Sequence, residues 1–182
     1  MNKLAFLLAG SVMLALAAPL TPAAATVETF EAKSAASEAA AMARADMADT
    51  FGVRSLKPGH YLWRDGVSVR APRVVIGLAD QRAYLYDANE LVAVSTISSG
   101  KSGYDTPTGI FPILQKKPVH HSRKYDNAPM PFMQRLDDYG IALHAGALPG
   151  RPASHGCIRL PAKFAAKLYG VTRIGSTVMI GA

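Results

Sequence analysis

Cysteine is almost absent from this chain, because Cys157 is the only one in 182 residues. A single cysteine excludes an intramolecular disulfide and any scaffold of paired cysteines. Free cysteines are among the most often buried residues, so a small structural residue is one interpretation of Cys157. An intermolecular link and a reactive thiol are the other two. The rest of the sequence has to decide between them.

Long apolar runs and clustered charge are also scarce. Beyond residue 25, no segment is apolar enough to cross a bilayer, which takes roughly 20 residues. The formal net charge is +7, yet the basic residues are scattered and contain no run of five. A basic protein can be attracted to anionic surfaces, but this scatter argues against nucleic acid as a partner. The charge alone selects no substrate.

The first 25 residues have the pattern of a secretory signal peptide. Lys3 gives a basic start, residues 4–20 carry no charge, and Ala23, Ala24 and Ala25 offer a small-residue cleavage site. A retained membrane anchor is the alternative, although the apolar run is short for one and two prolines interrupt its end. We therefore expect residues 1–25 to be removed, leaving an exported protein with no integral membrane segment.

Residues 26–72 form an alanine-rich stretch followed by a connector. Residues 31–48 favour a helix, but its apolar positions are mostly alanines, which bury little surface. We therefore expect a helix or a loose linker that packing holds only weakly. Glycine and proline are frequent in residues 51–70, which predicts a connector with room for a short strand.

From Arg73 onward the pattern changes to strands. Residues 74–78, 81–86 and 91–97 are rich in branched and aromatic residues, and a short Asp/Asn turn at residues 87–89 predicts a hairpin. Further strands are expected at residues 110–114, 132–136, 141–144 and 177–180, with a helix from Pro161 to about Tyr169. Residues 73–182 are therefore predicted to be a mostly β domain.

The groups able to support thiol chemistry gather near the single cysteine. A thiol that attacks a carbonyl needs a base and preorganised donors for the oxyanion. His144 ends a predicted strand thirteen positions before Cys157, and the Gly/Pro-rich loop between them can fold back. Gly156 permits an unusual backbone conformation beside the thiol. As metal ligands, His144, His155 and Cys157 would number only three, whereas a structural zinc site needs four. Cysteine hydrolase or transferase, buried cysteine and metal site all remain open at this point.

Residues 73–182 resemble the catalytic domain of the L,D-transpeptidase (YkuD-type) family. The resemblance rests on the upstream His144, on the Ser-His-Gly-Cys-Ile-Arg-Leu block at residues 154–160, and on the Thr-Pro-Thr-Gly-Ile-Phe run at residues 106–111. It implies an L,D-transpeptidase-like β-sandwich with a short helix after the cysteine. It also implies an enzyme of the periplasm or cell wall that acts on peptidoglycan stem peptides without a cofactor.

The resemblance also assigns roles to residues of this chain. Cys157 would be the nucleophile and His144 the general base, and an imidazolium beside the thiol would lower its pKa below about 8.5. The backbone of His155, Gly156 and Cys157 would form the oxyanion hole, and the carbonyl of Ala145 or Gly146 would orient the base. Ser154 would brace the loop or bind substrate, and Arg159 would contact a substrate carboxylate. The thirteen-residue spacing is short for the family and suggests a trimmed loop beside the site.

The implied reaction proceeds through a thioester. Cys157 attacks the carbonyl of the third stem residue and expels the terminal D-alanine, and an acceptor amine then resolves the acyl-enzyme. If water is the acceptor, the same site is an L,D-carboxypeptidase, and an inactive wall-binding module is a further alternative. The acceptor amine cannot be read from the sequence.

The long polar segment 116–131 is a separate candidate. We interpret His120 and His121 as solvated loop residues, because exposed loops are the usual place for such residues. The same segment would be able to cover the donor peptide as a lid. Tyr104 and residues 130–132 fit either the wall of a groove or the core.

Overall fold

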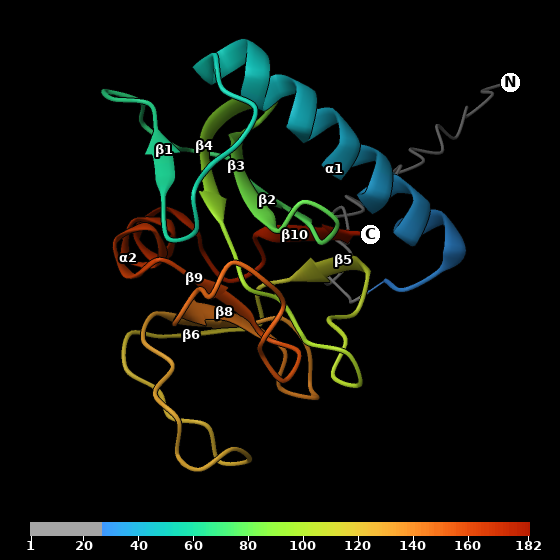
Figure 1. Ribbon diagram of the computed structural model, residues 1–182, viewed down its shortest axis with the longest axis vertical. Coiled ribbons are helices and arrows are strands. Elements are labelled where there is room, and N and C mark those ends of the chain that lie inside the picture. The colour runs from blue at the N-terminus through green and yellow to red at the C-terminus, as the bar shows by residue number, and fades with distance from the viewer. Residues whose placement is uncertain (1–26) are drawn as a thin grey trace, which may run out of the picture.

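The structure, a computed structural model, describes residues 27–182 and consists of two β-sheets with two helices (Figure 1). The predicted signal peptide lies outside the described residues. The helices are α1 (Phe30–Phe51) and α2 (Ala162–Val171). The strands are β1 (Tyr61–Trp63), β2 (Pro72–Gly77), β3 (Arg82–Asp87), β4 (Glu90–Thr96), β5 (Gly109–Pro112), β6 (Gln115–Lys117), β7 (Met133–Arg135), β8 (Ala142–Ala145), β9 (Ile158–Leu160) and β10 (Thr177–Gly181).

The strand order confirms the mostly β fold. The larger sheet has the order β1-β4-β3-β2-β10-β5 and the smaller one β6-β7-β8-β9. The expected hairpin is β3–β4, an antiparallel pair with a bulge between Leu85 and Tyr86. Only two neighbouring pairs among the described strands are parallel, β2 with β10 and β8 with β9. The second parallel pair positions the residues around the cysteine.

The main core lies between the two sheets and α2. Side chains of β8 and β9 that face it alternate with ones that do not, as the two-residue period of a strand requires. The residues that face the core are Leu143, Ala145, Ile158 and Leu160, and they pack with Val74, Ile76, Leu85, Phe164 and Leu168. The opposite face of the smaller sheet therefore carries the residues between them in sequence, His144 and Arg159.

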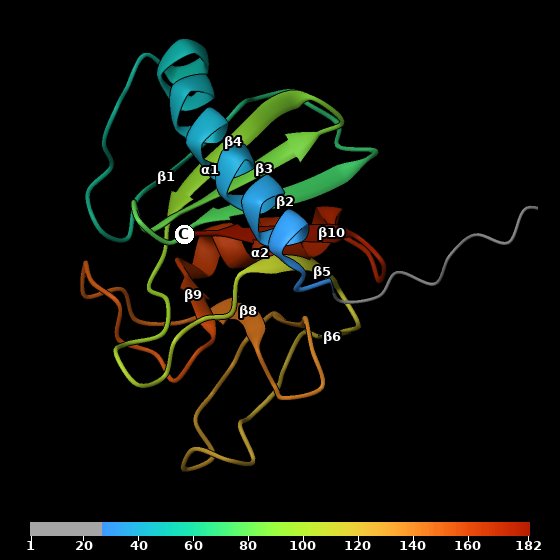
Figure 2. The ribbon, with the colours of Figure 1, turned by 90° about the vertical axis from the view of Figure 1, so that its right-hand side faces the viewer.

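Helix α1 covers the outer face of the larger sheet, as Figure 2 shows from the side of the helix. Its Ala43 and Met47 are fully buried against a cluster that includes Val75 and Tyr84. The helix predicted over residues 31–48 is present, but the expectation that packing would hold it only weakly is wrong. The reason is close approach: a Cβ on Gly181 of β10 would lie 2.4 Å from the Ala36 carbonyl oxygen.

Polar contacts also join α1 to the sheet. Asp80, in the turn before β3, accepts hydrogen bonds from Arg44 Nε at 3.3 Å and from the Tyr84 hydroxyl at 2.5 Å. The Tyr86 hydroxyl donates to Asp46 of the helix at 2.6 Å.

Within residues 27–182, none of the helices has both the length and the apolar character needed to cross a membrane.

Candidate active site

The parallel pairing of β8 with β9 brings His144 to the same face of the sheet as Cys157. The register pairs Leu143 with Ile158 and His144 with Arg159. Because Leu143 and Ile158 face the core, the neighbouring side chains face the other way. Cys157 directly precedes β9 and packs on that second face against Met130, Met133 and Ala142. The two residues that the sequence singles out therefore share one face and lie diagonally across two adjacent strands.

The Cys157 thiol is half-buried, and its surroundings favour the protonated form. Its Sγ donates to the Gly140 carbonyl oxygen at 3.5 Å. Burial raises the pKa of the thiol, and the charge of Asp137 adds to this, while the Ala142 backbone and Arg159 act in the opposite direction. The expectation of a lowered thiol pKa is thus not met. Burial of the sulfur against a carbonyl oxygen and apolar side chains outweighs the stabilisation of the thiolate by the Ala142 backbone and Arg159.

His144 is buried, and its surroundings favour the neutral form. Its Nδ1 lies 2.8 Å from the Ala145 carbonyl oxygen. A carbonyl only accepts, so Nδ1 carries the proton and Nε2 keeps a free lone pair. Burial lowers the pKa of His144, and the positive charge of Arg159 lowers it further, against the raising effect of the Ala145 hydrogen bond. Such an imidazole can take a proton from a neutral thiol during attack.

The residues just before the thiol form a tight loop that Ser154 holds together. Ser154 is 1% exposed, and its Oγ accepts from the Gly156 N–H at 3.1 Å and donates to the Cys157 carbonyl. This geometry fits the bracing role and leaves Ser154 little surface for a substrate. Gly156 has φ +108°, and a Cβ there would lie 2.7 Å from Ile141 Cδ1, so only glycine fits.

The hydrogen bond from the Gly156 N–H to Ser154 Oγ removes one of the expected oxyanion donors. The sequence nominates the backbone N–H groups of His155, Gly156 and Cys157 for this task. The Gly156 N–H is engaged by Ser154, whereas those of His155 and Cys157 have no acceptor among residues 27–182. The His155 and Cys157 N–H groups are therefore the remaining candidates for donors to a developing oxyanion.

Thr106 holds the cysteine loop from the other side. Its Oγ1 accepts from the Gly100 N–H at 2.9 Å and donates to the Gly156 carbonyl at 2.7 Å. Gly100 has no room for a side chain, since a Cβ would lie 1.9 Å from the Tyr104 carbonyl oxygen. The Thr-Pro-Thr-Gly run is therefore part of the site. Sequence reasoning missed this role, although the run itself was the available signal.

The two residues after His144 differ in their contacts. Ala145 offers its carbonyl to the imidazole, whereas the Gly146 N–H donates to Leu160 at 3.0 Å. Gly146 lies under the Arg159 side chain, with its Cβ position 3.0 Å from Arg159 Cγ. The Arg159 guanidinium has no hydrogen-bond partner among the residues that the structure describes, so this cation is available on the same face as His144 and Cys157.

Aromatic rings at the rim connect the segment between β6 and β7 to the cysteine loop. That segment, residues 118–132, projects from the smaller sheet (Figure 1). Its Tyr125 stacks on the His155 ring at 4.4 Å and 14°, and Tyr104 meets the same ring edge-on at 4.7 Å. Sequence reasoning missed Tyr125, because nothing in its local sequence marks it.

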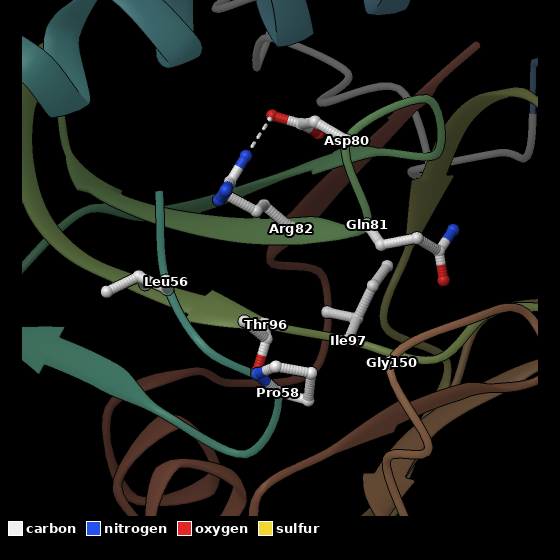
Figure 3. A pocket seen from close by; sticks show the side chains of 8 residues that line it. All are labelled: Leu56, Pro58, Asp80, Gln81, Arg82, Thr96, Ile97 and Gly150. Atoms are coloured by element: carbon white, nitrogen blue, oxygen red, sulfur yellow. Dashed lines mark hydrogen bonds and ion pairs between the residues drawn. The ribbon is translucent and has the colours of Figure 1, made fainter. Parts of the chain in front are cut away.

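A partly open pocket of about 90 Å³ lies away from the thiol (Figure 3). Its wall includes Asp80 and Arg82, which form an ion pair at 3.3 Å, together with Pro58 and Gly150. None of the predicted site residues lines it. Within the described part of the chain, no group of three or more His, Cys, Asp or Glu side chains is arranged to hold a metal ion.

Comparisons with known proteins agree with this geometry. The family model of the L,D-transpeptidase catalytic domain (YkuD) matches residues 71–180. Comparison with curated proteins finds no similar sequence. Among solved structures, an L,D-transpeptidase from Mycobacterium smegmatis has 23% identity and a TM-score of 0.57, over 62% of this chain and 59% of that chain.

Two further solved structures are similar. An L,D-transpeptidase (Yku) from Stackebrandtia nassauensis has 25% identity and a TM-score of 0.58, covering 74% of this chain and 64% of that one. L,D-transpeptidase 3 from Mycobacterium tuberculosis, in complex with a faropenem-derived adduct, has 21% identity and a TM-score of 0.57, over 62% and 60% of the two chains. In each case this chain spans less than two thirds of the relative.

Proposed function

Because the chain belongs to the L,D-transpeptidase (YkuD) family, we propose that it is an exported cysteine transpeptidase acting on peptidoglycan stem peptides. Cys157 is the nucleophile and His144 the general base. The observation that carries the proposal is the pair itself: a half-buried thiol and an imidazole with a free Nε2 lie on one face of paired strands. Residues 1–25 serve as the export signal, residues 26–72 as a helix and connector, and residues 73–182 as the catalytic domain.

Acylation starts from a neutral pair. The Cys157 proton passes to His144 Nε2 as the sulfur attacks the carbonyl carbon of the third stem residue. The N–H groups of His155 and Cys157 stabilise the oxyanion. When the tetrahedral intermediate collapses, the bond to the terminal D-alanine breaks and its amine takes the proton from His144. A thioester on Cys157 remains.

Deacylation reverses these roles. An acceptor amine attacks the thioester carbonyl while His144 removes a proton from it, and the proton then returns to the departing sulfur. The product is an L,D cross-link or another amide. Arg159, an unpaired cation on the same face, binds a carboxylate of the peptide. Attack by water instead gives an L,D-carboxypeptidase that uses the same residues.

The test uses the mature protein with purified tetrapeptide muropeptides and several candidate amines, with products identified by mass spectrometry. We expect loss of D-alanine and new amide products from the wild type and none from Cys157→Ala, whose fold should be unchanged because only a sulfur is removed. Free tripeptide as the sole product would assign the carboxypeptidase reaction. If neither a product nor an adduct from a penem or carbapenem β-lactam forms, the remaining alternative is an inactive wall-binding module.

A further inference from the structure

The turn between β7 and β8 is organised by one buried carboxylate. Asp137 is 6% exposed. Its Oδ1 accepts from three successive backbone N–H groups, those of Tyr139 at 3.0 Å, Gly140 at 2.8 Å and Ile141 at 2.8 Å. A carboxylate that accepts several backbone N–H bonds holds all of those peptide groups in one arrangement. The conformation of residues 137–141 therefore depends on this side chain.

This turn touches the nucleophile at two points. The Gly140 carbonyl accepts from the Cys157 thiol at 3.5 Å, so the orientation of that peptide group sets where the sulfur lies. The Ile141 side chain packs against Gly156, with Cδ1 2.7 Å from the position a Cβ would take there. A change in the conformation of the turn would thus displace the thiol and the loop that supplies the oxyanion donors.

We propose that Asp137 is a positioning residue for Cys157: its carboxylate fixes the 137–141 turn so that the Gly140 carbonyl holds the sulfur in place for transfer of its proton to His144. The inference rests on the proposed function only in assigning the reaction to Cys157. The neighbouring Asp138 has no such part, because its side chain is 91% exposed and pairs with Arg135 at 2.8 Å.

The charge of Asp137 gives the proposal a readout that a purely structural role would lack. Asp137 raises the pKa of the Cys157 thiol, and Arg159 of β9 lowers it. His144 of β8 lies on the same face, and burial lowers its pKa, so it favours the neutral form. Loss of the Asp137 charge removes one contribution that raises the thiol pKa and leaves the opposing charge of Arg159 unchanged, so the thiol should ionise at lower pH.

The experiment compares Asp137→Asn, Asp137→Ala and the control Asp138→Ala in the mature protein. Alkylation of the single cysteine by iodoacetamide is followed against pH by intact-mass spectrometry, and turnover of muropeptides is measured separately. The asparagine keeps an oxygen that can accept the three N–H bonds, so it should retain turnover near wild type while its alkylation midpoint moves to lower pH. Asp137→Ala should show the same shift and lose about 10²-fold in turnover, the usual cost of a small misplacement.

Two results would overturn the inference. One is an unchanged alkylation midpoint in Asp137→Asn, which decides the matter even if Asp137→Ala does not fold. The other is wild-type turnover in Asp137→Ala, matching Asp138→Ala. A failure of the proposed function looks different, since wild-type protein would then show no muropeptide turnover while the alkylation shifts persist.

Discussion

At the scale of single residues, the main feature of the site is that burial favours the neutral forms of Cys157 and His144, the proposed nucleophile and base. A preformed thiolate–imidazolium pair needs a thiol of low pKa beside a cationic base. Here burial acts the other way on both partners, raising the pKa of Cys157 and lowering that of His144. The energetic reason is that each charged form loses more hydration than it regains from its neighbours. Proton transfer and attack are therefore expected to occur in one step.

The neutral pair predicts a particular pH profile. His144 must be unprotonated to act as a base, and its lowered pKa extends the unprotonated form to lower pH than in a free imidazole. The rate of Cys157 acylation by a carbapenem should therefore fall only below the ordinary histidine pKa of about 6.5. His144→Ala should remove this acidic limb and slow acylation by about 10²- to 10⁴-fold, as for other positioned acid–base groups.

The matched control for this profile is His155→Ala. Its ring stacks on Tyr125 at the rim, whereas its backbone N–H survives the substitution, so the acidic limb should remain. Intact-mass spectrometry against pH measures both variants. If His155→Ala loses the acidic limb and His144→Ala keeps it, the wrong histidine has been assigned as the base.

At the scale of elements, α1 shows how an alanine-rich helix can be firmly held. Alanine contributes little area, but its small side chain lets the helix backbone approach the sheet closely at Gly181. The apolar contact then comes mainly from the sheet, through Tyr84 and Tyr86, and from Met47 on the helix. The helix ends are also specified, with Thr29 accepting from the Ala32 N–H at 3.3 Å and Gly52 in a left-handed conformation.

Two methionines of α1 provide a matched test of this packing. Met47 is fully buried, whereas Met42 is 62% exposed. Met47→Ala removes a large side chain from a packed interface and should lower the free energy of unfolding by about 2–5 kcal/mol. Met42→Ala should change it by less than about 0.5 kcal/mol. Urea unfolding of both variants gives the comparison, and equal effects would contradict the packing described here.

The elements also show what the sequence could and could not predict. The β3–β4 hairpin, β10 and α2 have clear patterns and turn residues, and they lie within about two residues of their expected bounds. Strands β6 and β9 were not predicted, because three residues are too few to show a period. In the site, the motif residues could be nominated in advance. The contacts of Thr106, Asp137 and Tyr125 could not, since they join segments far apart in the chain or depend on turn geometry.

At the scale of the whole molecule, the described fold extends beyond the part that the family model matches. That match begins at residue 71, yet two elements precede it: α1 packs on the larger sheet, and β1 is an edge strand of that sheet. Val27 also pairs with Ile110 of β5 through two backbone hydrogen bonds, at 2.8 and 2.9 Å. Residues before the catalytic domain thus cover one sheet face and part of its edge.

This arrangement predicts the result of shortening the chain. A protein of residues 53–182 keeps every proposed catalytic residue but lacks α1, so Val75, Tyr84 and Val94 lose their cover. Met47 alone is expected to contribute about 2–5 kcal/mol, and an exposed apolar sheet face promotes association. Because domains of this size are stable by only about 5–15 kcal/mol, the shortened chain should aggregate or unfold well below the melting temperature of the longer one. Circular dichroism and light scattering measure this directly, with carbapenem acylation of Cys157 as the functional readout. A soluble, folded fragment that is acylated at the full rate would show instead that the catalytic domain is complete without the helix.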